Sequence, residues 1–280
     1  MDEPDKPRLI TPLDRGDARF LSRNFYNLFE VVAADTDKLK EQAHHLRYQI
    51  FCLQEKGFED PEEHPDQLER DDFDSHADNI LIRFKPTGAA FGVIRVIYPY
   101  SRDLERSFPM QTLISARESP ILHGQSAANI VEYSRLGIWE QARSDIKECI
   151  KDSTLPLLRH FRKANPNLPR MLLSMAPLGL FNGAFDATLK KNILTAVSIM
   201  EPRHRDKLAS AGLIWHRLGP DKDFHGQRTP FLFNIREIFH KSRDHHPEVW
   251  HIVSAEGRHH KQAEIVMNKR LTETLAWRNR

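Results

Sequence analysis

Cysteine is scarce in this 280-residue chain, since Cys52 and Cys149 are the only two. A single pair supplies neither a disulfide framework nor the ligand spacing of a zinc site. Long apolar stretches are lacking as well, because no run approaches the roughly 20 residues that a membrane-spanning helix needs. The first residues, Met-Asp-Glu-Pro-Asp-Lys, are unlike a basic and then apolar signal peptide. We therefore expect a cytoplasmic enzyme or binding protein.

Several signatures of catalytic and metal sites are also missing. The sequence contains no Gly-x-Gly-x-x-Gly, no Walker A loop, no Gly-x-Ser-x-Gly elbow and no His-Glu-x-x-His. The chain has 15 histidines, but the most conspicuous form adjacent pairs, whose side chains do not share one face of a helix. These pairs are His44-His45, His245-His246 and His259-His260. We expect no metal site.

Charged residues are divided unevenly along the chain, although the net charge is only +2. Residues 1–150 carry 19 Lys and Arg against 27 Asp and Glu, whereas residues 151–280 carry 22 against 12. Either the basic half attracts an acidic partner (nucleic acid, an anionic membrane or an acidic carrier protein), or the two halves neutralise each other. Zinc-finger spacing, a ribonucleoprotein motif and a basic helix with interleaved aromatic residues are all missing, so we expect no nucleic acid partner. Loose membrane association stays open.

The hydrophobic pattern predicts a mixed α/β fold without a clean internal linker. We expect an irregular lead-in over residues 1–24, one domain over residues 25–240 and a helical C-terminal extension over residues 241–280. An acidic loop over residues 52–68 is either a lid or surface disorder. The predicted strands cover residues 26–34, 79–84, 90–97, 129–138, 194–200, 213–218 and 230–235. The first predicted helix begins at the capping residues Asp35 and Thr36. Further helices are predicted over residues 143–164, 176–192 and 201–211.

Carboxylates and arginines recur where a purely structural element does not need them. Glu69, Asp71 and Asp74 lie just before a predicted hairpin, and Arg95 lies in line with apolar side chains of its second strand. Burying an unpaired arginine costs several kcal/mol, so either these carboxylates pair with Arg95 or that face is exposed. Arg47, beside the apolar stripe of the first helix, is either a solvated edge residue or part of the same network.

The predicted strand over residues 129–138 spends four positions on Glu132, Tyr133, Ser134 and Arg135. Alternation places Glu132 and Ser134 on one face and the other two on the opposite face, unless a bulge intervenes. A carboxylate held by arginines keeps a low pKa and suits binding of an amine. A carboxylate in a cleft can instead deprotonate the amine, directly or through water. Together these features favour attack of an amine on an activated acyl group.

In order along the chain, five segments resemble the acyl-homoserine-lactone (autoinducer) synthases, a branch of the GCN5-related N-acyltransferase fold. They are Leu46 to Phe51, Glu69-x-Asp71-x-x-Asp74, Gly92-x-x-Arg95, Phe108 and Glu132-x-Ser134-Arg135. LRYQIFCLQEKGFE and EPRHRDKLASAGLIWHRLGP resemble still more closely the N-acyl amino acid synthases and the acyltransferases associated with the PEP-CTERM/exosortase system. Gly57-Phe58 stands where autoinducer synthases carry tryptophan, and the chain is longer than theirs, which disfavours S-adenosylmethionine as acceptor.

This resemblance implies a central sheet of the GCN5-related N-acyltransferase type, flanked by helices. It implies transfer of a fatty acyl chain from acyl carrier protein, as an acyl-phosphopantetheine thioester, to the amine of an amino acid or similar small molecule. No cofactor is expected to be tightly bound. The Arg/Gln-x-x-Gly-x-Gly/Ala loop of coenzyme A-dependent relatives is missing, which agrees with a carrier-protein donor. Two alternatives stay open: an autoinducer synthase that uses S-adenosylmethionine, and a non-catalytic acyl- or carrier-binding module.

The same resemblance implies roles for individual residues. Glu132 is the expected general base, and Ser134 is expected to hydrogen-bond the thioester or the tetrahedral intermediate. Arg135 completes the expected catalytic group. The expected substrate-binding residues shape the site, position the acceptor or line a pocket; they are Arg47, Phe51, Glu69, Asp71, Asp74, Arg95 and Phe108.

Overall fold

A mixed sheet runs through the centre of the computed structural model, which describes residues 15–55, 58–152, 158–159 and 167–278. The strand order is β1-β2-β3-β4-β5-β8-β6, and β7 also pairs with β8. Neighbours pair antiparallel, except that β4 and β5 pair in parallel. The strands are β1 (Phe29–Ala33), β2 (Ala77–Phe84), β3 (Ala89–Ile97), β4 (Ile130–Ile138), β5 (Thr195–Met200), β6 (His216–Arg217), β7 (Lys222–Asp223) and β8 (Gln227–Asn234).

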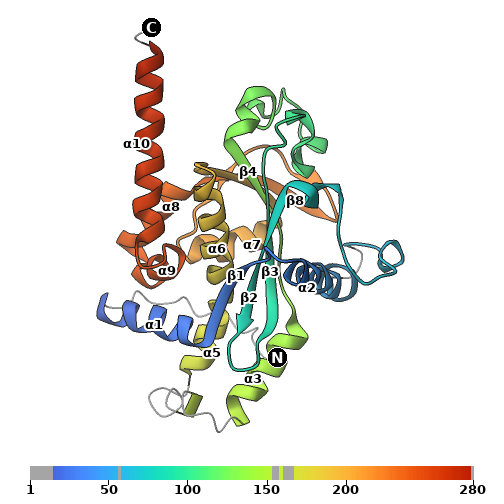
Figure 1. Cartoon of the computed structure of the whole chain (residues 1–280), viewed down its shortest axis with the longest axis vertical. Coiled ribbons are helices and arrows are strands. Elements are labelled where there is room, and N and C mark those ends of the chain that lie inside the picture. The colour runs from blue at the N-terminus through green and yellow to red at the C-terminus, as the bar shows by residue number, and fades with distance from the viewer. Residues whose placement is uncertain (1–14, 56–57, 153–157, 160–166, 279–280) are drawn as a thin grey trace, which may run out of the picture.

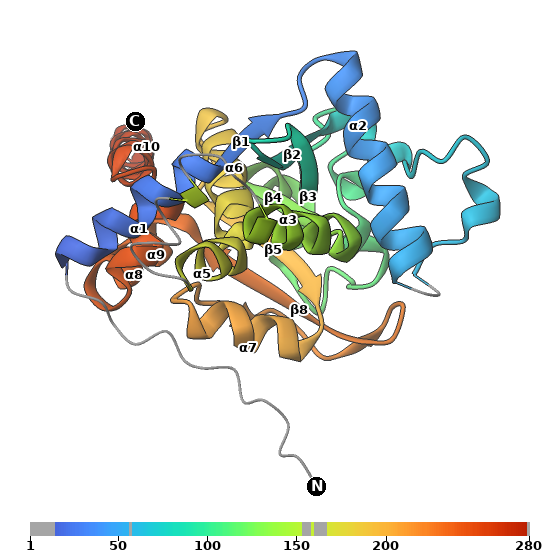
Figure 2. The same ribbon diagram turned by 90° about the horizontal axis from the view of Figure 1, so that it is seen from below.

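Helices cover both faces of this sheet, and Figure 2 shows α2 on one side and α6 on the other. The α-helices are α1 (Arg15–Leu28), α2 (Asp37–Arg47), α3 (Glu140–Asp152), α5 (Leu168–Ser174), α6 (Ala176–Lys190), α7 (Pro202–Ser210), α8 (Ile235–His245), α9 (Pro247–Val253) and α10 (Arg258–Arg278). A π-helical turn, Tyr48–Gln54, continues α2. In Figure 1, α10 extends past the rest of the fold. The predicted mixed α/β fold with a helical C-terminal part is confirmed.

Two apolar layers hold the sheet between these helices. Leu81 and Val93 pack with residues of α2 on one face, whereas Ile80 and Ile94 belong to the larger core on the α6 side. Helix α6 comes close to the strands at Gly183, where a Cβ atom would lie 2.4 Å from Cγ2 of Ile80. A glycine is therefore required there by the space available.

The segment before the first strand differs from its prediction. The irregular lead-in over residues 1–24 is wrong from Arg15 onward, because α1 runs to Leu28 and the strand begins only at Phe29. Ala18, Leu21, Phe25 and Leu28 are buried at helical spacing, and α1 packs on α9. The prolines of this segment, Pro4, Pro7 and Pro12, all precede Arg15, so they do not interrupt the amphipathic helix that follows. Residues 1–14 lie outside the described residues.

Two later elements also differ from their predictions. The predicted strand over residues 213–218 is reduced to His216–Arg217, because the N–H of Leu213 donates to the carbonyl of Leu208 at 3.0 Å and closes the end of α7. The helix predicted over residues 143–164 begins at Glu140, and residues 153–157 and 160–166 lie outside the described part. The predicted cap of α2 is confirmed, since Oγ1 of Thr36 accepts the Leu39 N–H at 3.3 Å.

No helix in the described part of the chain combines the length and the apolar content needed to span a membrane.

Candidate active site

Strand β4 carries the centre of the site, and a bulge sets which of its side chains face it. The pairing of β3 with β4 shifts register between Val93 and Arg95, so that two residues of β4 face one of β3. Arg135, one of these two, has a φ of 52°. The hydroxyl of Tyr133 donates to a backbone carbonyl of α6 at 3.1 Å, whereas Arg135 joins the side of Glu132 and Ser134. The bulge that the sequence left open is present.

A cavity opens where β4 and β5 separate. The two strands pair only over Ile130–Glu132 and Thr195–Val197. Beyond this point a cavity of about 420 Å³ lies between residues 133–138 of β4 and 198–200 of β5. We call it the inter-strand cavity. Large apolar side chains form much of its wall: Phe51, Leu136, Phe181, Leu208 and Trp215.

Arg47 organises the buried part of the predicted charge network. Its Nε donates to Glu69 at 2.5 Å, and its two terminal nitrogens donate to the two oxygens of Asp74 at 2.6 and 3.0 Å. Nη1 also donates to Asn79 at 3.2 Å. Arg47 and Glu69 are 0% and 1% exposed, so Arg47 is not a solvated edge residue. Burial alone would raise the pKa of Glu69, but the neighbouring guanidiniums of Arg47 and Arg135 lower it to about 2.

Arg95 connects this buried part to β4. Its Nε donates to Oγ of Ser134 at 2.9 Å, and its Nη1 donates to Asp71 at 2.6 Å and to Asp74 at 3.1 Å. The side chain is fully buried, so pairing rather than exposure is the correct alternative. Its Nη2 is buried without a hydrogen-bond partner among the residues that the structure describes. Burial would raise the pKa of Asp74, but Arg47 and Arg95 hold it well below its usual range.

Arg135 closes the network on the side of the predicted acidic loop. It donates to Oε1 of Glu69 at 2.9 and 3.1 Å and also pairs with Glu59. Its Cζ lies 5.5 Å from the ring centroid of Phe51 and 5.2 Å from that of Phe58. The loop therefore contributes Glu59 and Phe58 to the site.

Glu132 differs from the other carboxylates. It is 1% exposed, and its Oε2 accepts the backbone N–H of Met110 at 3.0 Å. Burial raises the pKa of this carboxyl to about 7, although the Met110 N–H and the Arg95 guanidinium act in the opposite direction. A carboxyl with this pKa accepts a proton near neutral pH, whereas Glu69 stays ionised. Carboxylates whose environments push their pKa values apart suit different roles in acid–base chemistry.

A second cavity, which we call the network cavity, measures about 280 Å³ and is lined by all three expected catalytic residues. Asp71 and Arg95 line it too, whereas Arg47, Glu69 and Asp74 support it from within the protein. The two cavities share wall residues Phe58, Tyr133, Ser134, Arg135, Ile199 and Arg228. They are therefore neighbours, and Ser134 belongs to the wall that they share.

The β7–β8 hairpin contributes a wall that the sequence did not predict. Phe224, His225 and Arg228 line the network cavity. The ring of His225 stacks on Phe58 with centroids 4.4 Å apart, and Cζ of Arg228 lies 5.2 Å from the same ring. The available signal was two aromatic rings inside an otherwise polar turn, GPDKDFHGQR, which does not by itself indicate a site.

Phe51 and Phe108, the two phenylalanines expected in a pocket, lie in different surroundings. Phe51 lines the inter-strand cavity. Phe108 is fully buried in a small apolar cluster with Met110 and Ile97 and lines neither of the two cavities, so its expected role in substrate binding stays a prediction. Its neighbour Pro109 lines the network cavity instead. Phe108 supports the turn that delivers the Met110 N–H to Glu132.

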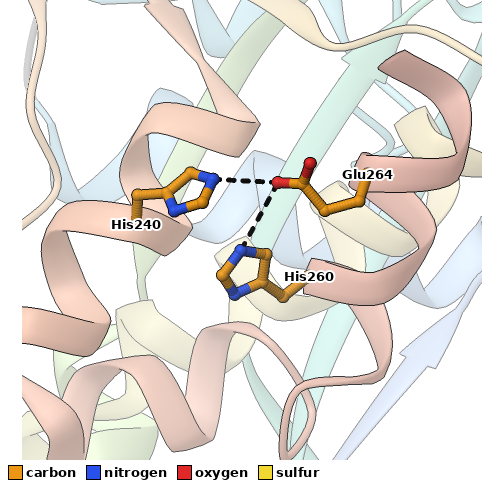
Figure 3. Close-up of side chains that lie close together, drawn as sticks. All are labelled: His240, His260 and Glu264. Carbon is orange, nitrogen blue, oxygen red and sulfur yellow. Dashed lines mark hydrogen bonds and ion pairs between the residues drawn. The ribbon is translucent and has the colours of Figure 1, made fainter. Parts of the chain in front are cut away.

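His240, His260 and Glu264 lie close together between α8 and α10 (Figure 3). His260 belongs to the adjacent pair His259-His260, for which we expected no metal site. Oε1 of Glu264 lies 2.8 Å from Nε2 of His240 and also accepts from Nε of Arg236 at 2.7 Å. The indole N–H of Trp250 donates to Nδ1 of His260 at 3.2 Å, which leaves the proton of the neutral ring on Nε2. These contacts occupy the ligand atoms and favour a role in tying the two helices together.

Comparisons with known proteins agree with this architecture. Residues 46–147, less than half of the chain, match a family model described as acetyltransferase (GNAT) domain. TofI, solved in a ternary complex with an inhibitor and MTA, is 16% identical, with 79% of this chain and 99% of that chain covered and a TM-score of 0.50. BjaI, a CoA-dependent acyl-homoserine lactone synthase solved with SAM and isopentyl-CoA, is 16% identical, with 81% and 88% covered and a TM-score of 0.50.

A further structure, FeeM, an N-acyl amino acid synthase from uncultured soil microbes, is 13% identical over 76% of this chain and 94% of that chain, with a TM-score of 0.48. No curated protein sequence matches the chain. The family match and the two structures with a TM-score of 0.50 confirm the GCN5-related N-acyltransferase fold, and the family match supports an acyltransferase.

Proposed function

We propose that this chain is an N-acyltransferase that moves a fatty acyl chain from acyl carrier protein to the amine of an amino acid or similar small molecule. The observation that carries this proposal is Glu132, whose pKa is raised to about 7 in the wall of the network cavity. A buried base of this kind, next to an apolar cavity between separated strands, suits aminolysis of a thioester.

The acceptor enters the network cavity as an ammonium ion, and Glu132 removes one proton, directly or through a water molecule. The neutral amine then attacks the thioester carbon and forms a tetrahedral intermediate. Oγ of Ser134 accepts the Arg95 Nε–H, which leaves the serine hydroxyl hydrogen free to donate to the developing oxyanion. The nitrogen then loses a second proton as the carbon–sulfur bond breaks, and the pantetheine sulfur takes up a proton and leaves as a thiol. One proton is released overall.

The acyl chain occupies the inter-strand cavity. Phe51, Phe181 and Trp215 offer an apolar wall, and burial of methylene groups there is favourable. Because Ser134 lines both cavities, a chain in one and an amine in the other meet beside its hydroxyl.

The start of α3, directly after β4, supports a carrier-protein donor. Helix N-termini bind phosphate groups through free backbone N–H groups and a positive dipole end. Here the Glu140 N–H already donates to Oε1 of Gln54 at 2.8 Å, and the Glu140 carboxylate adds a negative charge to the first turn. Both features oppose the pyrophosphate of coenzyme A. Arg143, His204 and Lys207 line the inter-strand cavity nearby and suit an acidic carrier protein.

Mass spectrometry of lipid extracts tests the proposal most directly. Cells that express the intact chain are expected to contain new N-acyl amino acids, and cells that express Glu132→Gln are expected to lack them. Purified protein is then supplied with the same acyl chain on acyl carrier protein or on coenzyme A. We expect the carrier-protein donor to react faster. Release of methylthioadenosine from S-adenosylmethionine would instead identify an autoinducer synthase. If the protein binds an acyl chain but transfers it to no amine, the result would favour the non-catalytic binding module.

A further inference from the structure

We propose that Arg228 binds a carboxylate of the acceptor, so that the acceptor is a zwitterionic amino acid rather than a simple amine. This inference rests on the proposed function and deepens it. It concerns a residue on the hairpin that the resemblance to known synthases does not include, and it specifies what the network cavity selects.

Arg228 is held at the boundary between the two cavities, with an exposure of 9%. Its Nε donates to the carbonyl of Phe224 at 2.7 Å, and its Cζ lies 5.2 Å from the Phe58 ring centroid. These contacts fix the plane of the guanidinium. The position of the Arg228 guanidinium is therefore set by the Phe224 carbonyl and the Phe58 ring, and not by a carboxylate.

The remaining N–H groups of Arg228 are poorly used by the described residues. The contact from Nη2 to the His225 carbonyl is 3.4 Å, and the distance from Nη2 to Oε1 of Glu201 is 3.8 Å. By contrast, Arg47, Arg95 and Arg135 each contact at least two carboxylates. A guanidinium has five donors in a planar fork, which matches a carboxylate in two parallel hydrogen bonds. Arg228 therefore offers the binding groups that an incoming carboxylate needs.

The opposite charge of a zwitterion also finds partners in the network cavity. Asp71 and Glu132 line it, and Glu132 is the group that would take the proton from the ammonium. Nη2 of Arg95, buried without a described partner, belongs to a residue of the same wall and is a second donor for the carboxylate. Phe58, Phe73 and Phe224 are among the apolar residues that line the cavity, which suits an acceptor with an apolar or aromatic side chain.

The test compares amino acids with the amines that lack only their carboxylate: phenylalanine with phenethylamine, tyrosine with tyramine and leucine with isoamylamine. Wild type, Arg228→Gln, Arg228→Lys and the control Arg217→Gln are assayed with one acyl carrier protein donor. Arg217, a nearby arginine on β6, is 56% exposed and lies outside both cavities. Melting curves of all four proteins confirm folding.

Wild type is expected to prefer the amino acid of the best pair. Arg228→Gln is expected to raise KM for that amino acid about 10- to 100-fold, the effect of losing hydrogen bonds to a charged group, and to leave KM for the amine unchanged. Arg228→Lys keeps the charge and is expected to recover part of the preference, and Arg217→Gln to behave as wild type.

The outcomes separate this inference from the proposed function. If wild type acylates no amine at all, the proposed function fails. If wild type is active but prefers the decarboxylated amines, or if Arg228→Gln raises both KM values equally, the assignment of Arg228 is overturned. Should Arg228→Gln not fold, Arg228→Lys decides: equal losses with acid and amine would then refute the assignment.

Discussion

Replacing Glu132 by glutamine removes the ionisable group of the proposed base and keeps the shape of the side chain. The amide oxygen can still accept the Met110 N–H that Oε2 now accepts at 3.0 Å. The variant therefore isolates the proton-accepting function. General-base catalysis typically contributes about 10²- to 10⁴-fold, and we expect turnover to fall within this range.

The same substitution has a second consequence, which is a change of stability with a calculable sign. Burial raises the pKa of Glu132 from 4.5 to about 7. A raised pKa in the folded protein contributes stability that is fully present below the unfolded pKa and is lost as pH rises through the folded pKa. One pKa unit corresponds to about 1.4 kcal/mol, so wild type loses about 3 kcal/mol through this group between about pH 4.5 and pH 8.

Urea unfolding at about pH 5 and about pH 8 measures this loss. Glutamine is neutral at both pH values, so between them the variant is expected to lose about 2.5 kcal/mol less than wild type. Burying the amide N–H groups of glutamine destabilises the variant equally at both pH values. This contribution therefore cancels when the change in unfolding free energy between the two pH values is compared. An inactive variant whose pH dependence of stability matches that of wild type would refute the reasoning. Such a result would mean that Glu132 is ionised throughout and acts as a structural member of the network.

Three further predictions concern the same network and its support. The acidic limb of the pH–rate profile of wild type is expected near pH 7, the pKa of Glu132, and a limb near pH 4.5 would contradict the assignment of the base. Arg47→Met leaves buried Glu69 and Asp74 without their main partner, so urea melts should show a loss of about 3–5 kcal/mol, against less than about 0.5 kcal/mol for Arg70→Met, which is 56% exposed. Gly183→Ala places a Cβ 2.4 Å from Cγ2 of Ile80, so it should cost about 1–3 kcal/mol, whereas Gly219→Ala, where the nearest atom is 3.4 Å away, should be nearly neutral.

The charged network was predictable because its members break local patterns. Arg95 stands in an apolar strand face, and the cost of burying it unpaired is enough to indicate carboxylate partners from the sequence alone. Asp71 and Asp74 lie only a short distance upstream, so the pairing needed no knowledge of long-range topology. Arg47 was undecided, because a helix-edge arginine is consistent with both solvation and pairing.

The walls of the cavities were not predictable in the same way. Arg228 and His225 reach the site through the pairing of β5 with β8, and this pairing follows from the whole order of the sheet. The orientation of Arg135 depends on its own φ of 52°. Sequence patterns assign this conformation to glycine or asparagine rather than to arginine. Helix α1 was missed because the prolines before Arg15 favoured an irregular segment, although Ala18, Leu21, Phe25 and Leu28 are buried at helical spacing.

The contrast between Glu69 and Glu132 shows why proximity of residues is not enough to define a catalytic base. Both carboxylates are almost fully buried, and arginines lie near both. Glu69 accepts hydrogen bonds from two guanidiniums, and its pKa is lowered to about 2. Arg95 directs Nε to Ser134 and Nη1 to Asp71 and Asp74, so Glu132 is left with a backbone N–H and a pKa of about 7. In the proposed mechanism, Ser134 and the two aspartates therefore preserve the basicity of Glu132 by engaging the arginine that would otherwise suppress it.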